Sequence, residues 1–375
     1  MAHKESGDRV IRDPTAICLF KDPILQWLLQ NGGFMDSQVF ILNEKRNVTL
    51  TAYLQDDSQE FWRAKKRPAV VIFPGGAYAY CSDREADPVA QEYLRAGYHA
   101  FVLRYSVGWE NAVWPNPLED YDQAMELIAA HAKEWHLIPE KIAVIGFSAG
   151  GHLAACAATM AKHRPAAAIL AYPVILEGLA AICAKGAPGA DKAVDSQTCP
   201  CFIAATGTDT TVSAMNSLRF VEALYENGIS AELHLYAFGP HGFSTARTSI
   251  ADPAELCSRT LHWVEDSISW LEDVFGAFTS GEMSSPRCPG RVRKDKDPYL
   301  SVDCQLATIA GNQMAVERLK QLILVEETTQ KWIAEQKENL LTSEMTLRSA
   351  LQFLNVPGEV IRKADEILSE IPNRK

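Results

Sequence analysis

The chain has 375 residues, of which 47% are hydrophobic and 22% charged, and its formal net charge is −11. Because this length exceeds what one hydrophobic core usually holds, we expect one large domain with an appendage. The negative charge argues against nucleic-acid binding, since no basic stripe is available to neutralise phosphates.

The first residues and the cysteines predict a location. Residues 1–13 are polar and mixed in charge, without the apolar segment of a secretory signal, and no window approaches the roughly 18 apolar residues of a membrane span. Among nine cysteines the only close pair, Cys199 and Cys201, lacks the two-residue gap typical of zinc or redox sites. We therefore expect reduced thiols, a cytoplasmic protein and no membrane partner.

Strand-like and helix-like segments alternate between residues 48 and 275. Short apolar or alternating runs predict strands at 48–54, 69–73, 100–103, 142–145, 167–172, 202–206 and 232–236. Helical patterns fall at 86–96, 121–135, 150–162, 213–226 and 255–275. Buried strands that alternate with helices predict an α/β fold, with a mostly parallel sheet covered by helices on both faces.

The pattern changes near residue 279. Residues 279–298 are rich in Ser, Pro, Gly and charged residues, which is typical of a linker between a large domain at 1–278 and a helical segment at 299–375. Helices are expected there at 313–325, 329–341, 346–354 and 359–371. Because such short helices need an apolar partner, we expect them to pack on the large domain of this chain or of a second copy, which would form a homo-oligomer. An independent module on a tether is the alternative.

One pentapeptide indicates nucleophilic chemistry. Gly146-Phe147-Ser148-Ala149-Gly150 stands between the strand at 142–145 and the following helix. This is the layout of a nucleophile elbow, in which the serine sits on a tight turn and only glycine-sized neighbours let the backbone pass close to the helix. The pentapeptide alone is a weak signal, but its strand and helix context makes it specific. We predict that Ser148 is the nucleophile.

A serine nucleophile needs a base and an acid that orients the base. On strand–helix scaffolds with this elbow they follow the serine in the order acid, then histidine, in loops after later strands. Asp209 follows the strand at 202–206, and His241 follows the strand at 232–236. We predict that His241 takes the proton from Ser148 and that Asp209 orients the imidazole.

Acyl transfer also needs backbone N–H groups that face the developing oxyanion. Ala149, the residue after the nucleophile, is expected to supply one. The second should come from the glycine-containing loop after the strand at 69–73. There either Gly76 or Ala77 is expected to donate, and the sequence does not decide between them.

These motifs together resemble one family. The shared stretches are Pro74-Gly75-Gly76-Ala77-Tyr78, Ser82-Asp83-Arg84-Glu85, residues 97–106, residues 146–154, Asn216-Ser217-Leu218 and Pro240-His241-Gly242. From about residue 35 to 275 the chain resembles the acetylesterase/lipase-like branch of the α/β-hydrolases, which includes carbohydrate acetylesterases of the acetylxylan-esterase kind. The resemblance implies the α/β-hydrolase fold and hydrolysis of short acyl esters without a metal or organic cofactor.

The chain departs from that branch in three places. Phe73-Pro74 replaces the His-Gly that often begins the oxyanion loop, and the acid motif ends in Ser213 where Asp-x-x-Val-Pro is usual. Residues 173–200 are short and rich in Ala and Gly, where relatives carry a larger substrate-shaping insertion. The resemblance therefore bears more strongly on the reaction than on the substrate.

We predict a serine esterase that acts on short-chain acyl esters, foremost acetyl esters, of a small molecule or an oligosaccharide. Four aromatic residues in loops near the predicted site are candidates for stacking on a sugar, with simple packing as the alternative: Tyr78, Trp109, Trp114 and Tyr172. Other serine hydrolases on this fold, namely a thioesterase, an arylformamidase-like amidase or a peptidase, remain open. So does a non-catalytic binding protein of the same fold.

Overall fold

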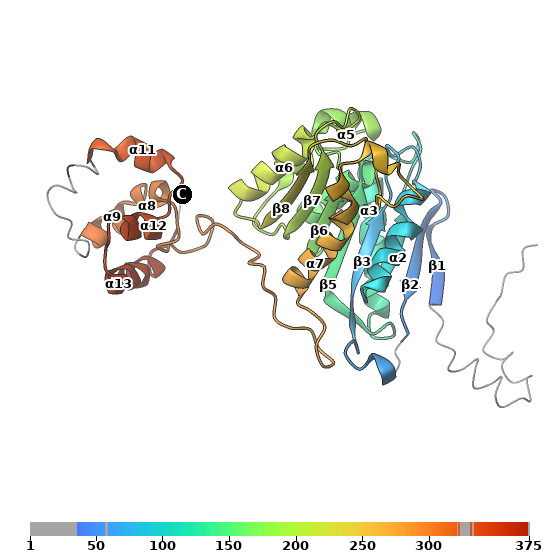
Figure 1. The fold of residues 1–375 in the computed structure, drawn as a ribbon, viewed down its shortest axis with the longest axis horizontal. Helices are drawn as coiled ribbons and strands as arrows, with labels where there is room; N and C mark the ends of the chain where they lie inside the picture. Colours follow the sequence, from blue (N-terminus) through green and yellow to red (C-terminus); the bar gives the residue numbers. More distant parts are fainter. Residues whose placement is uncertain (1–35, 57–58, 321, 323–330, 332–333, 374–375) are drawn as a thin grey trace, which may run out of the picture.

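The computed structural model describes residues 36–56, 59–320, 322, 331 and 334–373, and its centre is an eight-stranded sheet (Figure 1). The order across the sheet is β1-β2-β4-β3-β5-β6-β7-β8. The pairs β1–β2 and β2–β4 are antiparallel, whereas the remaining neighbours are parallel. The strands are β1 (Asp36–Asn43), β2 (Val48–Leu54), β3 (Arg67–Phe73), β4 (His99–Arg104), β5 (Leu137–Phe147), β6 (Ala167–Ala171), β7 (Cys201–Thr206) and β8 (Ala231–Tyr236).

Helices cover both faces of this sheet. On one face lie α3 (Asn116–His131), α4 (Ala149–Met160) and α6 (Met215–Glu226), and on the other lie α2 (Asp87–Arg95) and α7 (Trp263–Phe275). Successive side chains of a strand point to opposite faces, so Val71 joins the first apolar cluster and its neighbours Val70 and Ile72 join the second. The predicted fold class, a mostly parallel sheet between two layers of helices, is confirmed.

The sequence patterns missed two elements of this domain. The edge strand β1 exposes Val39 and Ile41, while Phe40 and Leu42 pack against the core. Its apolar residues on both faces obscure the alternation that marks a half-buried strand. The second, α5 (Glu177–Cys183), is a short helix with only Ala180 buried. The last helix of the sheet domain, predicted at 255–275, is shorter in the structure. Residues Ser258–His262 form a separate 3₁₀ turn before α7.

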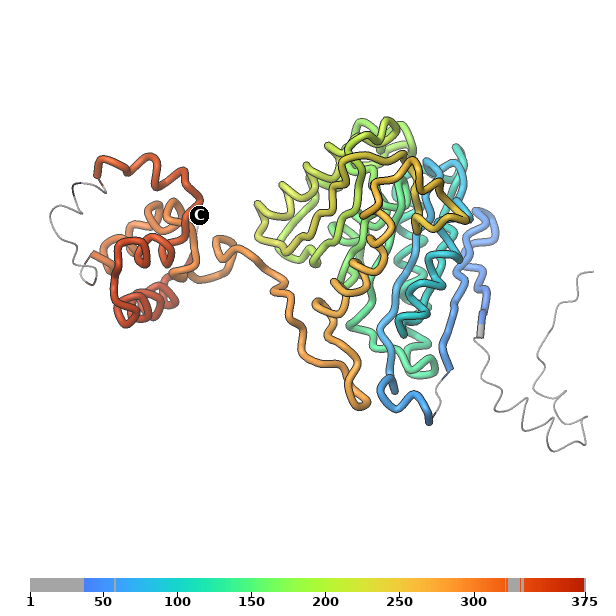
Figure 2. Tube along the Cα trace, viewed as in Figure 1, coloured from blue at the N-terminus to red at the C-terminus, as the bar shows by residue number. Residues whose placement is uncertain are grey.

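The segment after α7 is held against the large domain along part of its length. The N–H of Val292 donates to the Gly228 carbonyl (2.9 Å), and the N–H of Ser230 donates to the Gly290 carbonyl (3.2 Å). These bonds attach it to the turn between α6 and β8. Figure 2 shows the same segment continuing as an extended chain to the C-terminal helices.

The C-terminal helices bury a core of their own. They are α8 (Leu306–Ala310), α9 (Gln313–Lys320), α11 (Lys337–Thr342), α12 (Leu347–Phe353) and α13 (Gly358–Ser369). Their apolar cluster draws all of its described members from residues 300–371, and Figure 1 shows these helices set apart from the sheet. Nothing in the described chain therefore supports packing of the tail on the sheet domain of the same copy. The homo-oligomer contact stays a prediction, and part of the predicted helix at 329–341 lies outside the described residues.

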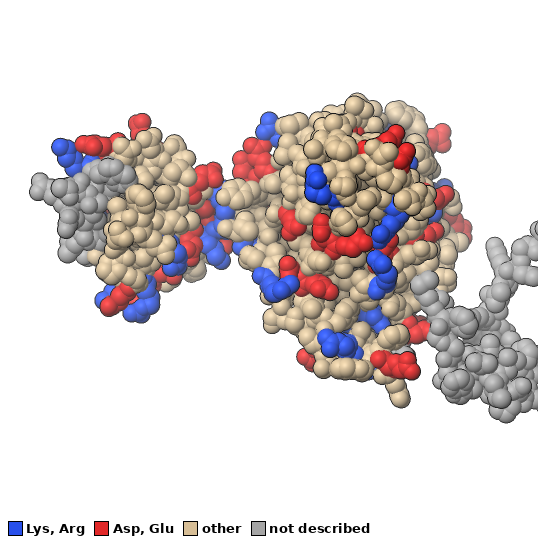
Figure 3. Space-filling view, in the orientation of Figure 1, with Lys and Arg blue, Asp and Glu red and all other residues tan. Residues whose placement is uncertain are grey.

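The surface, the thiols and the helices add three observations. On the face shown in Figure 3, acidic and basic side chains are interspersed without a continuous basic stripe. Each cysteine between residues 36 and 373 is a free thiol. Among the described helices, none is long and apolar enough to cross a membrane.

Candidate active site

Ser148 occupies a strained turn between β5 and α4. Its backbone has φ 53° and ψ −115°, a conformation that non-glycine residues adopt only where the surrounding structure holds them. A Cβ on Gly146 would overlap the Gly150 carbonyl, and a Cβ on Gly150 would overlap the carbonyl of Phe73 in β3. The two glycines are therefore required because backbone passes where side chains would be.

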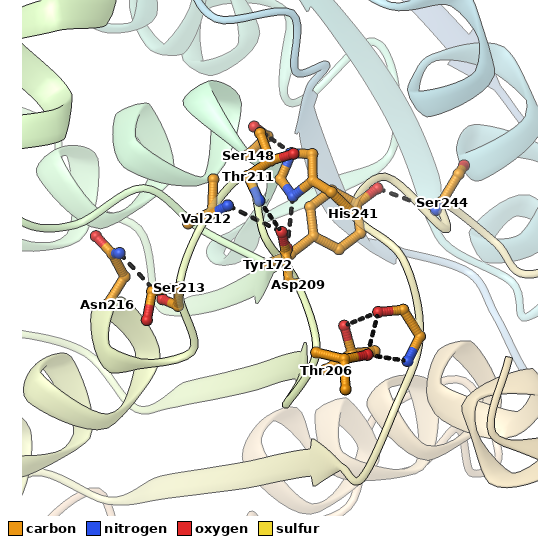
Figure 4. Close-up of polar contacts among 12 residues, drawn as sticks. Ser148, Tyr172, Thr206, Asp209, Thr211, Val212, Ser213, Asn216, His241 and Ser244 are labelled. Carbon is orange, nitrogen blue, oxygen red and sulfur yellow. Dashed lines mark hydrogen bonds and ion pairs between the residues drawn. The ribbon is translucent and has the colours of Figure 1, made fainter. Parts of the chain in front are cut away.

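The structure brings the three residues of the predicted triad into one hydrogen-bonded chain (Figure 4). His241 Nδ1 lies 2.6 Å from Asp209 Oδ2, and His241 Nε2 lies 2.9 Å from Ser148 Oγ. An ionised carboxylate only accepts hydrogen bonds, so Nδ1 carries the proton and the Nε2 lone pair faces the serine. Each residue follows a parallel strand, and the carboxyl ends of such strands meet at one edge of the sheet.

The Asp209 carboxylate is held in place by backbone donors as well as by His241. Its Oδ1 accepts the N–H groups of Thr211 (2.8 Å) and Val212 (2.9 Å), both in the turn that follows β7. Burial raises the pKa of Asp209, but the hydrogen bonds from His241, Val212 and Thr211 outweigh it, and the pKa lies below its ordinary value. Asp209 is therefore ionised at neutral pH and stabilises the imidazolium form of His241.

Two threonines join the loop that carries His241 to the loop that carries Asp209. Thr206 Oγ1 donates to the Gly239 carbonyl (2.9 Å), and Thr208 Oγ1 accepts the Gly239 N–H (3.0 Å). Figure 4 shows Thr206 and its contacts beside the triad. The separation between the acid and the base is thus set by direct bonds between the ends of β7 and β8.

The predicted oxyanion donors lie beside the nucleophile. Ala149 is the first residue of α4, where a helix leaves its backbone N–H groups unpaired. In the loop after β3, Gly75 packs against Ser148, and its N–H donates to Glu85 Oε2 (2.8 Å). Within residues 59–320 no acceptor contacts the N–H of Gly76 or Ala77, so both stay available and the choice between them stays open.

Two of the four candidate sugar-stacking residues are corrected. Tyr78 and Tyr172 are each 1% exposed, so neither ring can offer a face to a sugar. Tyr78 O–H donates to His152 Nδ1 (2.9 Å), while His152 Nε2 lies 2.8 Å from the Pro188 carbonyl. Burial lowers the pKa of His152 to about 4, which leaves the ring neutral and able to serve both contacts. These tyrosines pack because their hydroxyls find partners inside the protein.

The two tryptophans differ from each other. Trp114 is half-buried, and its ring centroid lies 5.5 Å from that of His152, so it packs against α4. Trp109 is 81% exposed. Its loop is attached to the oxyanion loop, because the N–H of Gly108 donates to the Tyr78 carbonyl (2.8 Å). Of the four, Trp109 is the one whose ring is largely exposed.

Sequence reasoning assigned no role to two buried polar residues near the site. Glu85 is 2% exposed and bonds to the oxyanion loop. Asn216, in α6, uses Oδ1 to accept the N–H groups of Ile175 (2.9 Å) and Leu176 (3.0 Å) and so secures the loop after β6. Both stand in stretches that carry the family resemblance, but sequence alone does not reveal that a polar side chain is buried.

Comparison with known proteins identifies the fold family of this chain. The family described as BD-FAE matches residues 60–174. The crystal structure of MGS-M1, an alpha/beta hydrolase enzyme from a Medee basin deep-sea metagenome library, is 42% identical and superposes with a TM-score of 0.60. That match covers 64% of this chain and 98% of MGS-M1.

Two further relatives carry names that mention acetyl groups and xylose-based compounds. The acetyl ester-xyloside bifunctional hydrolase from Caldicellulosiruptor lactoaceticus is 29% identical, with a TM-score of 0.55, over 63% of this chain and 96% of that one. The acetylxylan esterase of Xylanibacter ruminicola is 29% identical over 47% of this chain. This chain spans less than half the length of the curated relatives it matches, 41% in the case of the acetylxylan esterase.

Proposed function

Because this chain belongs to the α/β-hydrolase family, we propose that it is a serine carboxylesterase that cleaves short acyl esters, foremost acetyl esters of carbohydrates. The observation that carries the reaction type is the chain of hydrogen bonds from Asp209 through His241 to Ser148 Oγ. A nucleophile, a base and an orienting acid in this order are the machinery of acyl transfer through a covalent intermediate.

The first half-reaction acylates the serine. His241 Nε2 removes the proton from Ser148 Oγ as the oxygen attacks the ester carbonyl carbon, and the carbonyl oxygen becomes an oxyanion. The Ala149 N–H, together with that of Gly76 or Ala77, stabilises this charge. When the C–O bond to the alcohol breaks, the proton on Nε2 passes to the leaving alkoxide, which departs as the alcohol.

The second half-reaction regenerates the enzyme. His241 Nε2 removes a proton from water, whose oxygen attacks the acyl carbon and forms a second oxyanion in the same place. The intermediate collapses, the bond to Ser148 Oγ breaks, and the proton returns from Nε2 to the serine. Asp209 stays ionised throughout and stabilises each transient imidazolium.

The loop between β6 and β7 supports a small acyl group. It holds only the seven-residue helix α5 and a 3₁₀ turn at Ala190–Ala193, and few large apolar side chains stand in it. Burial of a methylene group contributes about 0.8 kcal/mol, so a site without an apolar cover gains little from each added carbon.

We expect kcat/KM to fall as the acyl chain lengthens. With p-nitrophenyl esters, acetate and propionate should be hydrolysed at least about tenfold more efficiently than octanoate, because the longer chain finds no surface on which to be buried. Steady-state kinetics across acetate, propionate, butyrate, hexanoate and octanoate measure this preference. Efficiency that rises steadily with chain length would contradict the proposal for acetyl groups and leave the esterase reaction intact.

The exposed ring of Trp109 supports carbohydrate as the alcohol. Flat aromatic faces bind the apolar face of a sugar ring, and an amphipathic ring such as Trp serves well where one side is wet. The names of two relatives, an acetylxylan esterase and an acetyl ester-xyloside hydrolase, point in the same direction.

We expect Trp109→Ala to weaken the use of acetylated xylo-oligosaccharides and to spare small esters. Release of acetate from the oligosaccharides should show a KM raised about fivefold or more, while KM for p-nitrophenyl acetate changes less than twofold, because only the sugar reaches the ring. Trp62→Ala is the matched control, since that tryptophan is also exposed and precedes the central strand β3, at the end of the strand opposite to the oxyanion loop. Equal KM values for wild type and Trp109→Ala on the oligosaccharides would exclude this contact.

A further inference from the structure

Glu85 is a buried carboxylate between two parts of the active site. It ends the short 3₁₀ turn Asp83–Glu85 and is 2% exposed. Its Oε2 accepts the N–H of Gly75 (2.8 Å), in the loop that carries the oxyanion donors, and its Oε1 accepts the Tyr172 hydroxyl (2.7 Å). One side chain therefore links the loop after β3 to the residue that follows β6.

Tyr172 extends this link to the base. Its ring contacts the His241 imidazole edge-to-face, with centroids 4.9 Å apart and an interplanar angle of 68°. Its hydroxyl also accepts the N–H of Ser244 (3.0 Å), in the turn just after the histidine (Figure 4). Ser244 Oγ in turn donates to the Arg84 carbonyl, and the Trp263 indole N–H donates to the Ser244 carbonyl (2.8 Å). The loop that carries His241 is thus bound to the residues around Glu85.

The hydrogen bonds of Glu85 suit this position. Both groups that contact Glu85 are donors, and a carboxylate can accept from both at once. The Arg84 guanidinium is 3.9 Å from Oε1, beyond hydrogen-bond distance. A buried carboxylate is costly unless hydrogen bonds and an ion pair satisfy it, and Glu85 has two hydrogen bonds and the ion pair with Arg84. A glutamine could accept only one of these bonds and would have to donate in the other.

We propose that Glu85 and Tyr172 are positioning residues for the ester hydrolysis proposed above. Glu85 sets the loop of the oxyanion donors through Gly75, and through Tyr172 it sets the ring of His241. The pair therefore holds the oxyanion donors and the base at a constant separation while the intermediate forms. Neither residue needs to touch the substrate, so the effect falls on the rate of the chemical steps rather than on binding.

The test compares Tyr172→Phe, Glu85→Gln and the double variant with wild type on p-nitrophenyl acetate. Tyr172→Phe keeps the ring against His241 and removes only the hydroxyl, and its melting temperature shows whether the fold is retained. Tyr93→Phe is the matched control, because Tyr93 is equally buried and its hydroxyl contacts Ser267 (2.7 Å). Each variant is characterised by kcat, KM, melting temperature and the rate of labelling by a fluorophosphonate probe.

We expect kcat and the labelling rate to fall about tenfold in Tyr172→Phe, with KM changed less than twofold, since small misplacements of catalytic groups cost large factors in rate. Glu85→Gln should fall by a similar factor, and the double variant by little more than either single one, because each single variant already disrupts the bond between Tyr172 and Glu85. Tyr93→Phe should lower the melting temperature at most and keep wild-type kcat.

Two results would overturn the inference. Wild-type kcat in folded Tyr172→Phe would show that the link does not position the base, and equal losses in Tyr93→Phe would show a general effect of core hydroxyls. The proposed function fails in a different way, since wild type itself would then neither hydrolyse the ester nor react with the probe.

Discussion

Ser148→Ala is expected to lower kcat for p-nitrophenyl acetate by about 10⁴-fold or more, because the variant lacks the oxygen that forms the acyl-enzyme. The fold should be unchanged. Among the described residues the serine hydroxyl contacts only His241, and an alanine can adopt the same turn as long as the neighbouring glycines remain. Steady-state hydrolysis measures the loss of kcat, and far-UV circular dichroism tests whether the fold is unchanged. Labelling by a fluorophosphonate tests whether the nucleophile is lost.

Ser230→Ala is the matched control for this experiment. Ser230 precedes β8 at the opposite end of the sheet from the triad, and its hydroxyl contacts only the Cys288 thiol among the described residues. The control should retain wild-type activity and labelling. Activity close to wild type in purified Ser148→Ala, or labelling that persists in it, would rule out Ser148 as the nucleophile.

His241→Ala is expected to lower kcat by a factor similar to that for Ser148→Ala, since the serine hydroxyl then has no base. Asp209→Asn should cost less, about 10²- to 10⁴-fold. The amide still fills the site, but its NH₂ group can face Nδ1 and favour the wrong tautomer of His241. Kinetics at several pH values separate the loss of the base in His241→Ala from its misorientation in Asp209→Asn, because raising the pH does not restore a histidine that is absent.

The double variant Ser148→Ala/His241→Ala gives the sharper comparison. Residues that act as one unit are not additive, so the double variant should be about as slow as either single variant. His234→Ala is the control, since His234 lies within β8 and contacts Glu232 and Tyr236 rather than the triad. If the two losses multiplied, His241 and Ser148 would be acting independently and the triad assignment would be wrong.

Most strand positions along the chain, the elbow and the members of the triad could be predicted from the sequence because each depends on local pattern. A strand buried on both faces appears as a continuous apolar run, as in Val70-Val71-Ile72 of β3. Once the strands are parallel, their carboxyl ends share one edge, so residues directly after them, such as Asp209 and His241, must lie together. The edge strand β1 was not predicted, because it is not buried on both faces.

The tertiary structure decided everything that depends on which side chains become buried and what they meet. Nothing in the sequence distinguishes the buried Tyr172 from the exposed Trp109, since both are aromatic residues in loops near the site. Glu85 has the sequence signature of an ordinary surface carboxylate, and of its two donors Gly75 is ten residues away in the chain, whereas Tyr172 is 87 residues away. The tail likewise has helical periodicity, but periodicity shows only that an apolar face exists. Which surface covers that face is a matter of long-range packing, and in the described residues it is covered by the tail's other helices.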